Sequence, residues 1–225
     1  MCIRDSFLVD WEYPSNAQQG KDYGSLLSFL RLYFPSPRYT LSSALPAHAW
    51  ALQNVDLRCV SHYLDLINLM TYDFSGPWSN LTGHHSQLYS RSDSEPSGQS
   101  GVTYLLTHTV PARKILLGIP VYGRSFTGAS GPGQSYTGHA GEEGTFEYRN
   151  LPRPGTQEYV DEQACAAYCV SKDAGFVSYD NAQTVTQKAR FVRFNGLGGL
   201  FYWTGTADKE GSGSLVLAGY LGLHS

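Results

Sequence analysis

The stretch "KILLGIPVYG", residues 114–123, is almost entirely apolar and ends in a tyrosine and a glycine. A strand that is apolar on both faces is typical of a parallel sheet covered by helices. The runs "LDLINLMTYDF" (64–74) and "GLGGLFYW" (196–203) also have the composition of buried strands. Apolar residues at helical spacing separate such runs, and we expect helices at 22–34, 55–63, 101–109, 181–195 and in the closing "SGSLVLAGYLG". The sequence therefore predicts an α/β protein.

Polar and aromatic residues collect where the expected strands end, as at Asp10, Asp73, Arg124 and Trp203. In a (β/α)8 barrel, also called a TIM barrel, active sites are built at the carboxyl ends of several strands. No G-x-G-x-x-G sequence follows an expected strand, which argues against an open sheet that binds a dinucleotide. The pattern therefore favours a barrel.

The chain has fewer strands of this type than the eight of a complete barrel. The expected strands lie at residues 7–14, 38–46, 64–74, 114–123 and 196–203. A turn-rich stretch at 125–176, with short strand signals, interrupts the alternation. At about 31 residues per βα unit, five units and an insertion of roughly 50 residues account for about 205 residues. We therefore expect the first three units to be missing, which leaves the outer strands with exposed edges.

The composition excludes several classes of function. The 225 residues include 16 Lys+Arg and 19 Asp+Glu, for a net charge of −3 and without a basic run, so we expect no nucleic-acid partner. No apolar stretch approaches the ~20 residues that cross a bilayer, so we expect no membrane partner. Aromatic residues make up 13% of the chain, and such side chains stack on sugar rings as well as filling cores.

The cysteine and histidine pairs of the chain do not have the patterns of metal sites. Cys165 and Cys169 lie in "DEQACAAYCVSK" (161–172), which has a helical pattern, and we assign them neither a disulfide nor a zinc ion. His84 and His85 are adjacent on an expected loop, where histidines are usually solvated or pack against the loop. The sequence "NLT" makes Asn80 a glycosylation acceptor if the protein is secreted.

The first expected strand ends in carboxylates, in the stretch "FLVDWEYP" at residues 7–14. Alternate side chains of a strand share a face, so Asp10 and Glu12 should point together while Trp11 points away. Each of two neighbouring carboxylates disfavours ionisation of the other, which can leave one with the proton that a general acid needs. The alternative is that the strand ends at Val9 and that the acids belong to a solvated loop.

Four motifs occur together at the ends of four expected strands: "VDWEYP", "LMTYDFSGPW", "LGIPVYGRSF" and "GLGGLFYW". Their order and spacing resemble glycoside hydrolase family 18, the chitinases, and in particular its fungal members. The resemblance covers the chain from Phe7 almost to its end, and it disfavours the solvated-loop alternative. It implies an incomplete TIM barrel of strands 4 to 8, with a small α+β insertion domain between strand 7 and helix 7.

This resemblance implies a division of the chain into four parts. They are an artefactual leader at 1–6, barrel strands 4 to 7 at 7–124, the insertion domain at 125–176, and barrel helix 7 to helix 8 at 177–225. The leader sequence "MCIRDS" has no signal-peptide features.

The resemblance also implies a mechanism. Glu12 would be the general acid, and Asp10 would hold the acetamido N–H of the sugar and stabilise the positive charge that develops. No second enzyme carboxylate is needed as a nucleophile, because this family is substrate-assisted. Leu8 stands where the family motif has an aspartate, and we expect this difference to alter the pH profile rather than to abolish the chemistry.

The other motifs supply further site residues by resemblance. Tyr72 would donate a hydrogen bond to the acetamido oxygen, as a third catalytic residue. Substrate contacts are assigned to Trp11, Met70, Asp73, Tyr122, Arg124 and Trp203. The alternatives are a core role for Tyr72 and Trp203 and an ion pair with a neighbouring acid for Arg124. Whether Trp50 extends the binding surface stays open.

The resemblance thus implies a glycoside hydrolase that cleaves β-1,4-N-acetylglucosamine linkages with retention of configuration, without a cofactor or metal. We expect it to be secreted and monomeric, and to bind chitin or its oligosaccharides. The alternatives are a non-catalytic, chitinase-like sugar-binding protein, an endo-β-N-acetylglucosaminidase acting on N-glycans, and a piece that is inactive because barrel strands are absent. Such non-catalytic relatives usually lack the glutamate, whereas Glu12 is present.

Overall fold

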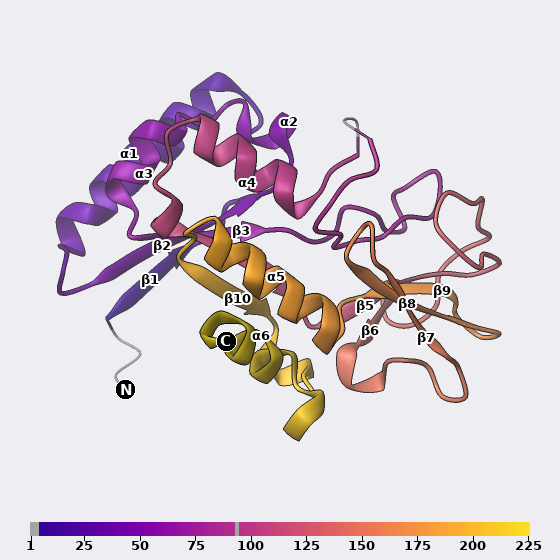
Figure 1. Cartoon of the computed structure of the whole chain (residues 1–225). Coiled ribbons are helices and arrows are strands. Elements are labelled where there is room, and N and C mark those ends of the chain that lie inside the picture. The colour runs from indigo at the N-terminus through magenta and orange to yellow at the C-terminus, as the bar shows by residue number, and fades with distance from the viewer. Residues whose placement is uncertain (1–4, 93–94) are drawn as a thin grey trace.

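The structure is a computed structural model that describes residues 5–92 and 95–225. Its larger part is a five-stranded parallel sheet in the order β1-β2-β3-β4-β10 (Figure 1). These strands are Ser6–Val9 (β1), Thr40–Pro46 (β2), Leu66–Met70 (β3), Ile115–Pro120 (β4) and Gly199–Trp203 (β10). The five parallel strands correspond in place to the five expected from the sequence. Most of the expected leader lies outside the described residues.

Helices connect these strands and cover one face of the sheet (Figure 1). They are Ala17–Tyr33 (α1), Ala49–Leu52 (α2), Leu57–Tyr63 (α3), Gly98–Thr107 (α4), Ala182–Phe194 (α5) and Leu215–His224 (α6). Helix α1 begins five residues earlier than expected, because the Asn16 side chain accepts a hydrogen bond from the Gln19 N–H at 3.0 Å and caps it. The short helix α2 was not expected.

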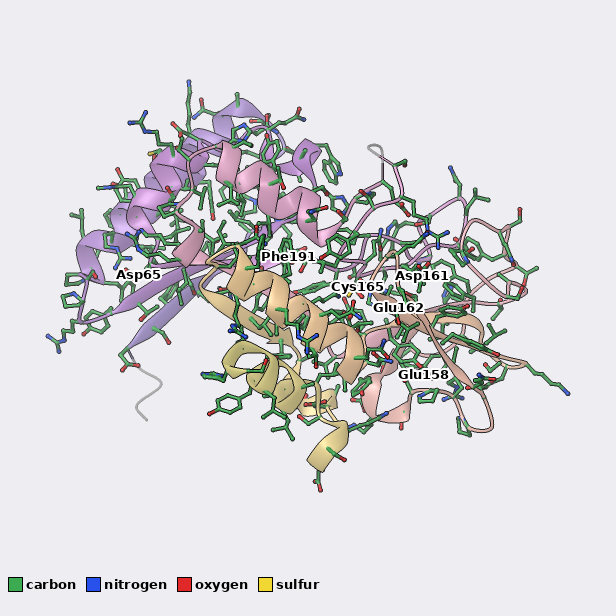
Figure 2. All side chains as sticks on the ribbon, in the orientation of Figure 1. Asp65, Glu158, Asp161, Glu162, Cys165 and Phe191 are labelled. Carbon is green, nitrogen blue, oxygen red and sulfur yellow. The ribbon has the colours of Figure 1, made fainter. Side chains whose placement is uncertain are left out.

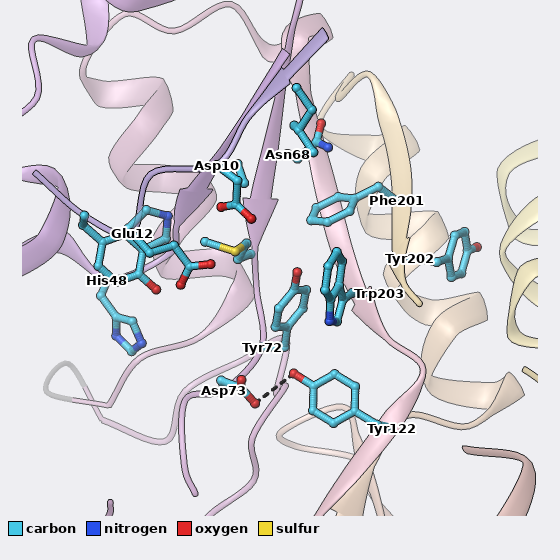
Figure 3. A pocket seen from close by; sticks show the side chains of 15 residues that line it. Asp10, Glu12, His48, Asn68, Tyr72, Asp73, Tyr122, Phe201, Tyr202 and Trp203 are labelled. Carbon is cyan, nitrogen blue, oxygen red and sulfur yellow. Dashed lines mark hydrogen bonds between the residues drawn. The ribbon is translucent and has the colours of Figure 1, made fainter. Parts of the chain in front are cut away.

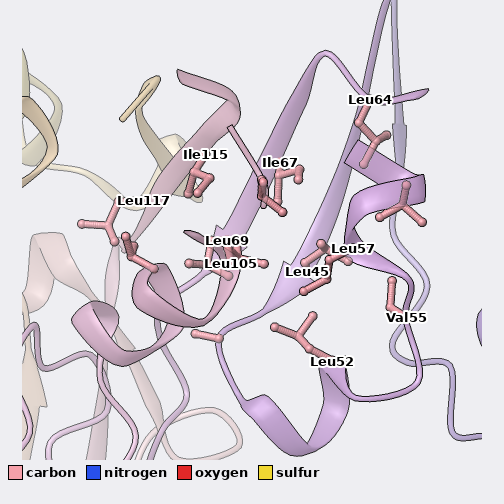
Figure 4. Packing of buried hydrophobic residues seen from close by; sticks show 14 of the residues in the cluster. Leu45, Leu52, Val55, Leu57, Leu64, Ile67, Leu69, Leu105, Ile115 and Leu117 are labelled. Carbon is pink, nitrogen blue, oxygen red and sulfur yellow. The ribbon is translucent and has the colours of Figure 1, made fainter. Parts of the chain in front are cut away.

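The hydrophobic core lies between the sheet and the helices, as Figure 4 shows. Leu45, Ile67, Leu69 and Leu117 of the strands meet Leu57 of α3 and other apolar residues of α1, α3 and α4. Alternate residues of β2 and β3 point away from this core, as the period of a strand requires. They line a cavity on the opposite face, so burial on both faces holds for β4 but not along the whole of β3.

The predicted strand at 114–123 is in fact two strands. β4 ends at Pro120, and β5 begins at Tyr122 in a second, antiparallel sheet. This sheet has the order β6-β5-β9-β8-β7 and lies beside the first (Figure 1). Its strands are Tyr122–Phe126 (β5), Thr145–Glu147 (β6), Glu158–Asp161 (β7), Ala166–Ser171 (β8) and Gly175–Tyr179 (β9).

The helical pattern at residues 161–172 is the one expectation for which the element type was wrong. Asp161 ends β7, and Ala166–Ser171 forms β8 between β7 and β9. Alanine is the strongest helix former, but helix propensity is only a weak predictor of structure, and burial in the middle of a sheet overrides it here. Both cysteines are therefore buried thiols: Cys169 lies on β8, and Cys165 immediately precedes it. Cys165 belongs to the same hydrophobic cluster as Phe191 of α5 (Figure 2).

Among the described residues, no helix is both long and apolar enough to cross a bilayer.

Candidate active site

A cavity of about 450 Å³ opens at the carboxyl end of the parallel sheet, on the face turned away from the core (Figure 3). The ends of β1, β2, β3 and β10 and the segments that follow them supply most of its walls. It is lined by Leu8, Asp10, Glu12, Tyr13, Ala44, Pro46, His48, Asn68, Met70, Tyr72, Asp73, Tyr122, Phe201, Tyr202 and Trp203.

The two predicted catalytic carboxylates face this cavity together. β1 ends at Val9, so Asp10 and Glu12 belong to the extended segment that follows it and not to the strand. Both nevertheless line the cavity with Leu8, and Figure 3 shows their carboxylates directed into the same space. The strand therefore ends at Val9, as the solvated-loop alternative predicts, but the two acids of the loop line the same cavity.

Trp11 lies outside the cavity, which corrects its assignment as a substrate contact. Its side chain packs against the hydrophobic core, and its ring meets that of Tyr23 edge to face with centroids 6.1 Å apart. The alternation that turns Asp10 and Glu12 into the cavity turns the intervening tryptophan the other way. Trp11 therefore anchors the segment that carries the acids.

Tyr72 lies beneath the carboxylates, two residues beyond the end of β3. Its ring packs close to Gly118 of β4, where a Cβ atom would come within 2.9 Å of it. Burial raises the pKa of Tyr72 above its ordinary value, and the charges of Asp73, Glu12 and Asp10 raise it further. The Tyr72 hydroxyl therefore keeps its proton and can donate a hydrogen bond into the cavity.

Asp73 anchors the far side of the cavity through bonds to β5. It accepts hydrogen bonds from the Tyr122 hydroxyl at 2.9 Å and from Arg124 Nε and Nη2, each at 2.8 Å. Burial alone would raise the pKa of Asp73, but His85 and Arg124 outweigh it and hold that pKa well below its usual range. A carboxylate is thereby kept charged at the cavity wall.

Arg124 does not line the main cavity. It contributes to a neighbouring hollow of about 280 Å³, and its guanidinium lies over the Trp78 ring at 4.9 Å from the centroid. Arg124 forms an ion pair with Asp73, which is the alternative to substrate contact that the sequence leaves open. Tyr122 and Arg124 do reach the same carboxylate, as their alternate positions on one strand predict.

Trp203 ends β10 and lines the cavity with 53% of its surface exposed, so it is not a plain core tryptophan. Phe201, two residues earlier on the same strand, also lines the cavity and meets the Tyr72 ring at 6.2 Å. Met70 lies across the cavity at the end of β3. A wide aromatic face thus stands opposite the carboxylates, where a sugar ring can stack.

The family model for glycosyl hydrolases family 18 matches residues 5–208, most of the chain. The chain belongs to glycosyl hydrolase family 18. It is 32% identical over 237 residues to Chitinase 1 of Aphanocladium album, covering 98% of this chain and 56% of that protein. It is 34% identical over 257 residues to the sporulation-specific chitinase 2 of Saccharomyces cerevisiae, covering 98% of this chain and 50% of that one. The chain therefore spans about half the length of these curated relatives.

Solved structures of chitinases are similar to this one along almost its whole length. A class V chitinase variant of Nicotiana tobaccum in complex with NAG4 has a TM-score of 0.88 and 26% identity, covering 98% of this chain and 69% of that one. The group IV chitinase of Ostrinia furnacalis in complex with allosamidin has a TM-score of 0.88 and 27% identity, covering 98% and 68%. The TIM-barrel-like α/β fold expected from the sequence is thereby confirmed.

Several residues that line the main cavity were not predicted from the sequence. Tyr13, His48, Asn68 and Phe201 line the cavity, and Asn68 could have been found as a polar residue inside an apolar strand. His48 follows β2 on a segment whose path the sequence does not reveal. The sequence does not decide whether Trp50 extends the binding surface. In the structure its side chain is 63% exposed and lines a hollow next to the cavity, and its ring meets that of Tyr13 edge to face with centroids 6.2 Å apart.

The two adjacent histidines are buried and not solvated. His84 lies between Ser178 Oγ at 3.1 Å and Asp161 Oδ2 at 3.3 Å, which joins the loop to the antiparallel sheet. His85 lies behind Asp73. Within residues 5–92 and 95–225, no group of three or more His, Cys, Asp or Glu side chains could hold a metal ion. Cys59, Cys165 and Cys169 are free thiols.

Proposed function

We propose that the protein carrying this chain hydrolyses β-1,4 linkages between N-acetylglucosamine units in chitin or chito-oligosaccharides, with retention of configuration. The observation that carries the proposal is the meeting of Asp10 and Glu12 in one cavity with the Tyr72 hydroxyl and the exposed Trp203 ring. The family membership and the chitinase names of the relatives support the same substrate class.

In the proposed first step, Glu12 gives its proton to the glycosidic oxygen as the bond to the anomeric carbon breaks. The carbonyl oxygen of the substrate's own acetamido group attacks that carbon, forming an oxazolinium ion. Water then attacks the same carbon and loses its proton to Glu12, which restores the acid and reopens the acetamido group. General acid–base assistance of this kind contributes typically 10²–10⁴-fold to the rate.

The neighbouring residues orient the substrate in this scheme. Asp10 accepts a hydrogen bond from the acetamido N–H and stabilises the positive charge, while the protonated Tyr72 donates a hydrogen bond to the acetamido oxygen. The sugar at the cleavage point stacks on Trp203 and contacts Met70 and Tyr122, and Asp73 binds a sugar hydroxyl. Arg124 acts by holding Asp73. The acid, its neighbour and the substrate supply all the chemistry, so the scheme calls for no cofactor.

At the level of the fold, we propose that the five parallel strands are strands 4 to 8 of an eight-stranded barrel. The antiparallel sheet that contains most of 125–176 would be the family's small insertion domain, between the barrel parts 7–124 and 177–225. The open sheet and the greater length of the relatives support this assignment. We also propose a secreted monomer. Asn80 of the glycosylation acceptor is exposed, as secretion with glycosylation requires.

The decisive variant is Glu12→Gln, which keeps the size of the side chain but removes the carboxyl group that gives up and takes back the proton. In the natural protein at its full length, we expect chitotetraose hydrolysis to fall by about 10²–10⁴-fold, as mass spectrometry of the products measures. Binding of chitotetraose by calorimetry should be kept. Unchanged hydrolysis in the variant, or no binding and no hydrolysis by the unsubstituted protein, would contradict the proposal. Binding without hydrolysis by the unsubstituted protein would favour the sugar-binding alternative.

A further inference from the structure

His85 is a fully buried histidine whose ring has no hydrogen-bond partner. It lies on the long loop between β3 and α4, its side chain is 0% exposed, and neither ring nitrogen is within hydrogen-bond distance of a partner among the described residues. Its backbone is well held: its N–H donates to Ser178 Oγ at 3.3 Å and its carbonyl accepts from the Phe74 N–H at 3.0 Å. Buried polar groups are nearly always paired, so the position of this ring needs an explanation.

The ring lies directly behind the cavity wall. His85 Nδ1 is 3.6 Å from Asp73 Oδ1, and its ring packs against Tyr122 with centroids 5.2 Å apart. The same Oδ1 atom accepts from the Tyr122 hydroxyl and from Arg124 Nε, whereas Oδ2 accepts one hydrogen bond from the described residues, that of Arg124 Nη2. Oδ1 is thus the anchored oxygen, and Oδ2 keeps a free lone pair on a side chain that is 35% exposed at the cavity.

The surroundings of His85 favour a neutral ring. Burial lowers its pKa, Asp73 and Asp180 oppose that shift, and Arg124 adds to it. A neutral imidazole carries one N–H, and among the residues that the structure describes, the carboxylate paired with Nδ1 is that of Asp73. At 3.6 Å the contact is longer than an ordinary N–H···O hydrogen bond.

We propose that His85 is a positioning residue that holds Asp73 Oδ1 from behind through its Nδ1–H, so that Oδ2 is presented to a hydroxyl of the bound sugar. The proposal rests on the proposed function for its ligand, and it assigns His85 no contact with the substrate. It explains why a polar ring is buried at this place, where an apolar side chain would fill the space equally well.

Two substitutions separate positioning from packing. His85→Asn keeps an amide N–H that can reach Asp73, whereas His85→Leu fills a similar volume without a donor. In the natural protein, we expect His85→Leu to raise KM for chitotetraose about tenfold, as for the loss of a hydrogen bond to a charged group, with kcat changed less than about twofold. His85→Asn should keep KM within about threefold. Equal effects of both variants on KM, or a loss confined to kcat, would overturn the proposal.

A double-variant cycle tests whether the effect passes through Asp73. In an Asp73→Asn background, His85→Leu should change KM by no more than about twofold, because the anchored oxygen no longer carries a charge. A full tenfold effect in that background would show that His85 acts by packing alone.

The contact between His85 Nδ1 and Asp73 can also be measured without substrate. Nitrogen-15 NMR of the imidazole at pH 7 should find His85 neutral with its proton on Nδ1, and Asp73→Asn should shift the Nδ1 resonance. A proton on Nε2, or a resonance unmoved by Asp73→Asn, would overturn the proposal. If the protein neither binds nor cleaves chitotetraose, the proposed function fails, while this spectrum still decides the His85 contact.

Discussion

At the scale of single residues, the site depends on groups whose charge is fixed by their neighbours. Asp73 stays ionised because Arg124 and His85 outweigh the cost of its burial. Tyr72 stays protonated because burial and three nearby carboxylates all disfavour its phenolate. A charged acceptor and a neutral donor therefore line the same cavity as the acids on the segment after β1.

Tyr72→Phe should remove the donor to the acetamido oxygen while keeping the ring in place. We expect kcat for chitotetraose to fall on the order of 10²-fold, as when one donor to a developing charge is removed. Because the pKa of Tyr72 is raised, its hydroxyl stays neutral throughout the neutral and mildly alkaline range, so the alkaline side of the pH profile should keep its midpoint in the variant. A pH series of initial rates checks both points. A kcat within about threefold of the unsubstituted protein would contradict the assigned role.

How far the sequence predicts this site can be seen in the segment after β1. Period-2 spacing correctly places Asp10 and Glu12 on one side, although β1 ends before either of them. The same spacing turns Trp11 into the core, which the motif alone does not reveal. The sequence gives no sign of the position of His85, since its closeness to Asp73 arises only from the path of the loop.

At the scale of elements, the long apolar runs predict the parallel strands well, because burial in a sheet has a strong sequence signal. The antiparallel sheet is predicted only in part: the short strand signals "GTFEYRNL" (144–151) and "FVSYD" (176–180) coincide with β6 and β9, whereas β7 and β8 were not expected. The strand expected at 114–123 divides between two sheets at Val121, whose N–H donates to the Trp203 carbonyl at 2.7 Å. The alanine-rich β8 had a helical pattern, and its strand form depends on neighbours that lie far away in the sequence.

Helix α5 holds the loop that carries His84 and His85. Lys188 of α5 is 2% exposed, and its Nζ donates to Asp180 Oδ2 and to the Ser86 carbonyl, each at 2.6 Å. A helix side chain thus binds both the residue that follows β9 and the residue next to His85. Because both charges are buried, removing one leaves the other without its partner.

Lys188→Met should therefore destabilise the fold, by roughly 3–5 kcal/mol of unfolding free energy in urea titration. The matched control is Lys188→Met with Asp180→Asn, which removes both charges and should recover much of the loss. A cost below about 1 kcal/mol for the single variant would show that the pair contributes little.

At the scale of the whole molecule, the parallel sheet is open, with β1 and β10 at its two edges. The cavity lies between these edge strands, and its rim residues Leu8 and Trp203 are about half exposed. Leu8 lies beside Asp10 and Glu12, as the strand spacing predicts, so the difference from the family motif lies within the site itself. One chain therefore brings together carboxylates, tyrosine and tryptophan from segments far apart in the sequence.

The most direct test of this account is a crystal structure of the Glu12→Gln variant of the natural protein with chitotetraose bound. We expect one sugar ring stacked on Trp203, its acetamido group within hydrogen-bond distance of Asp10 and Tyr72, and the adjoining glycosidic oxygen beside the substituted side chain. A sugar chain bound elsewhere, or an acetamido group turned away from Asp10, would contradict the account.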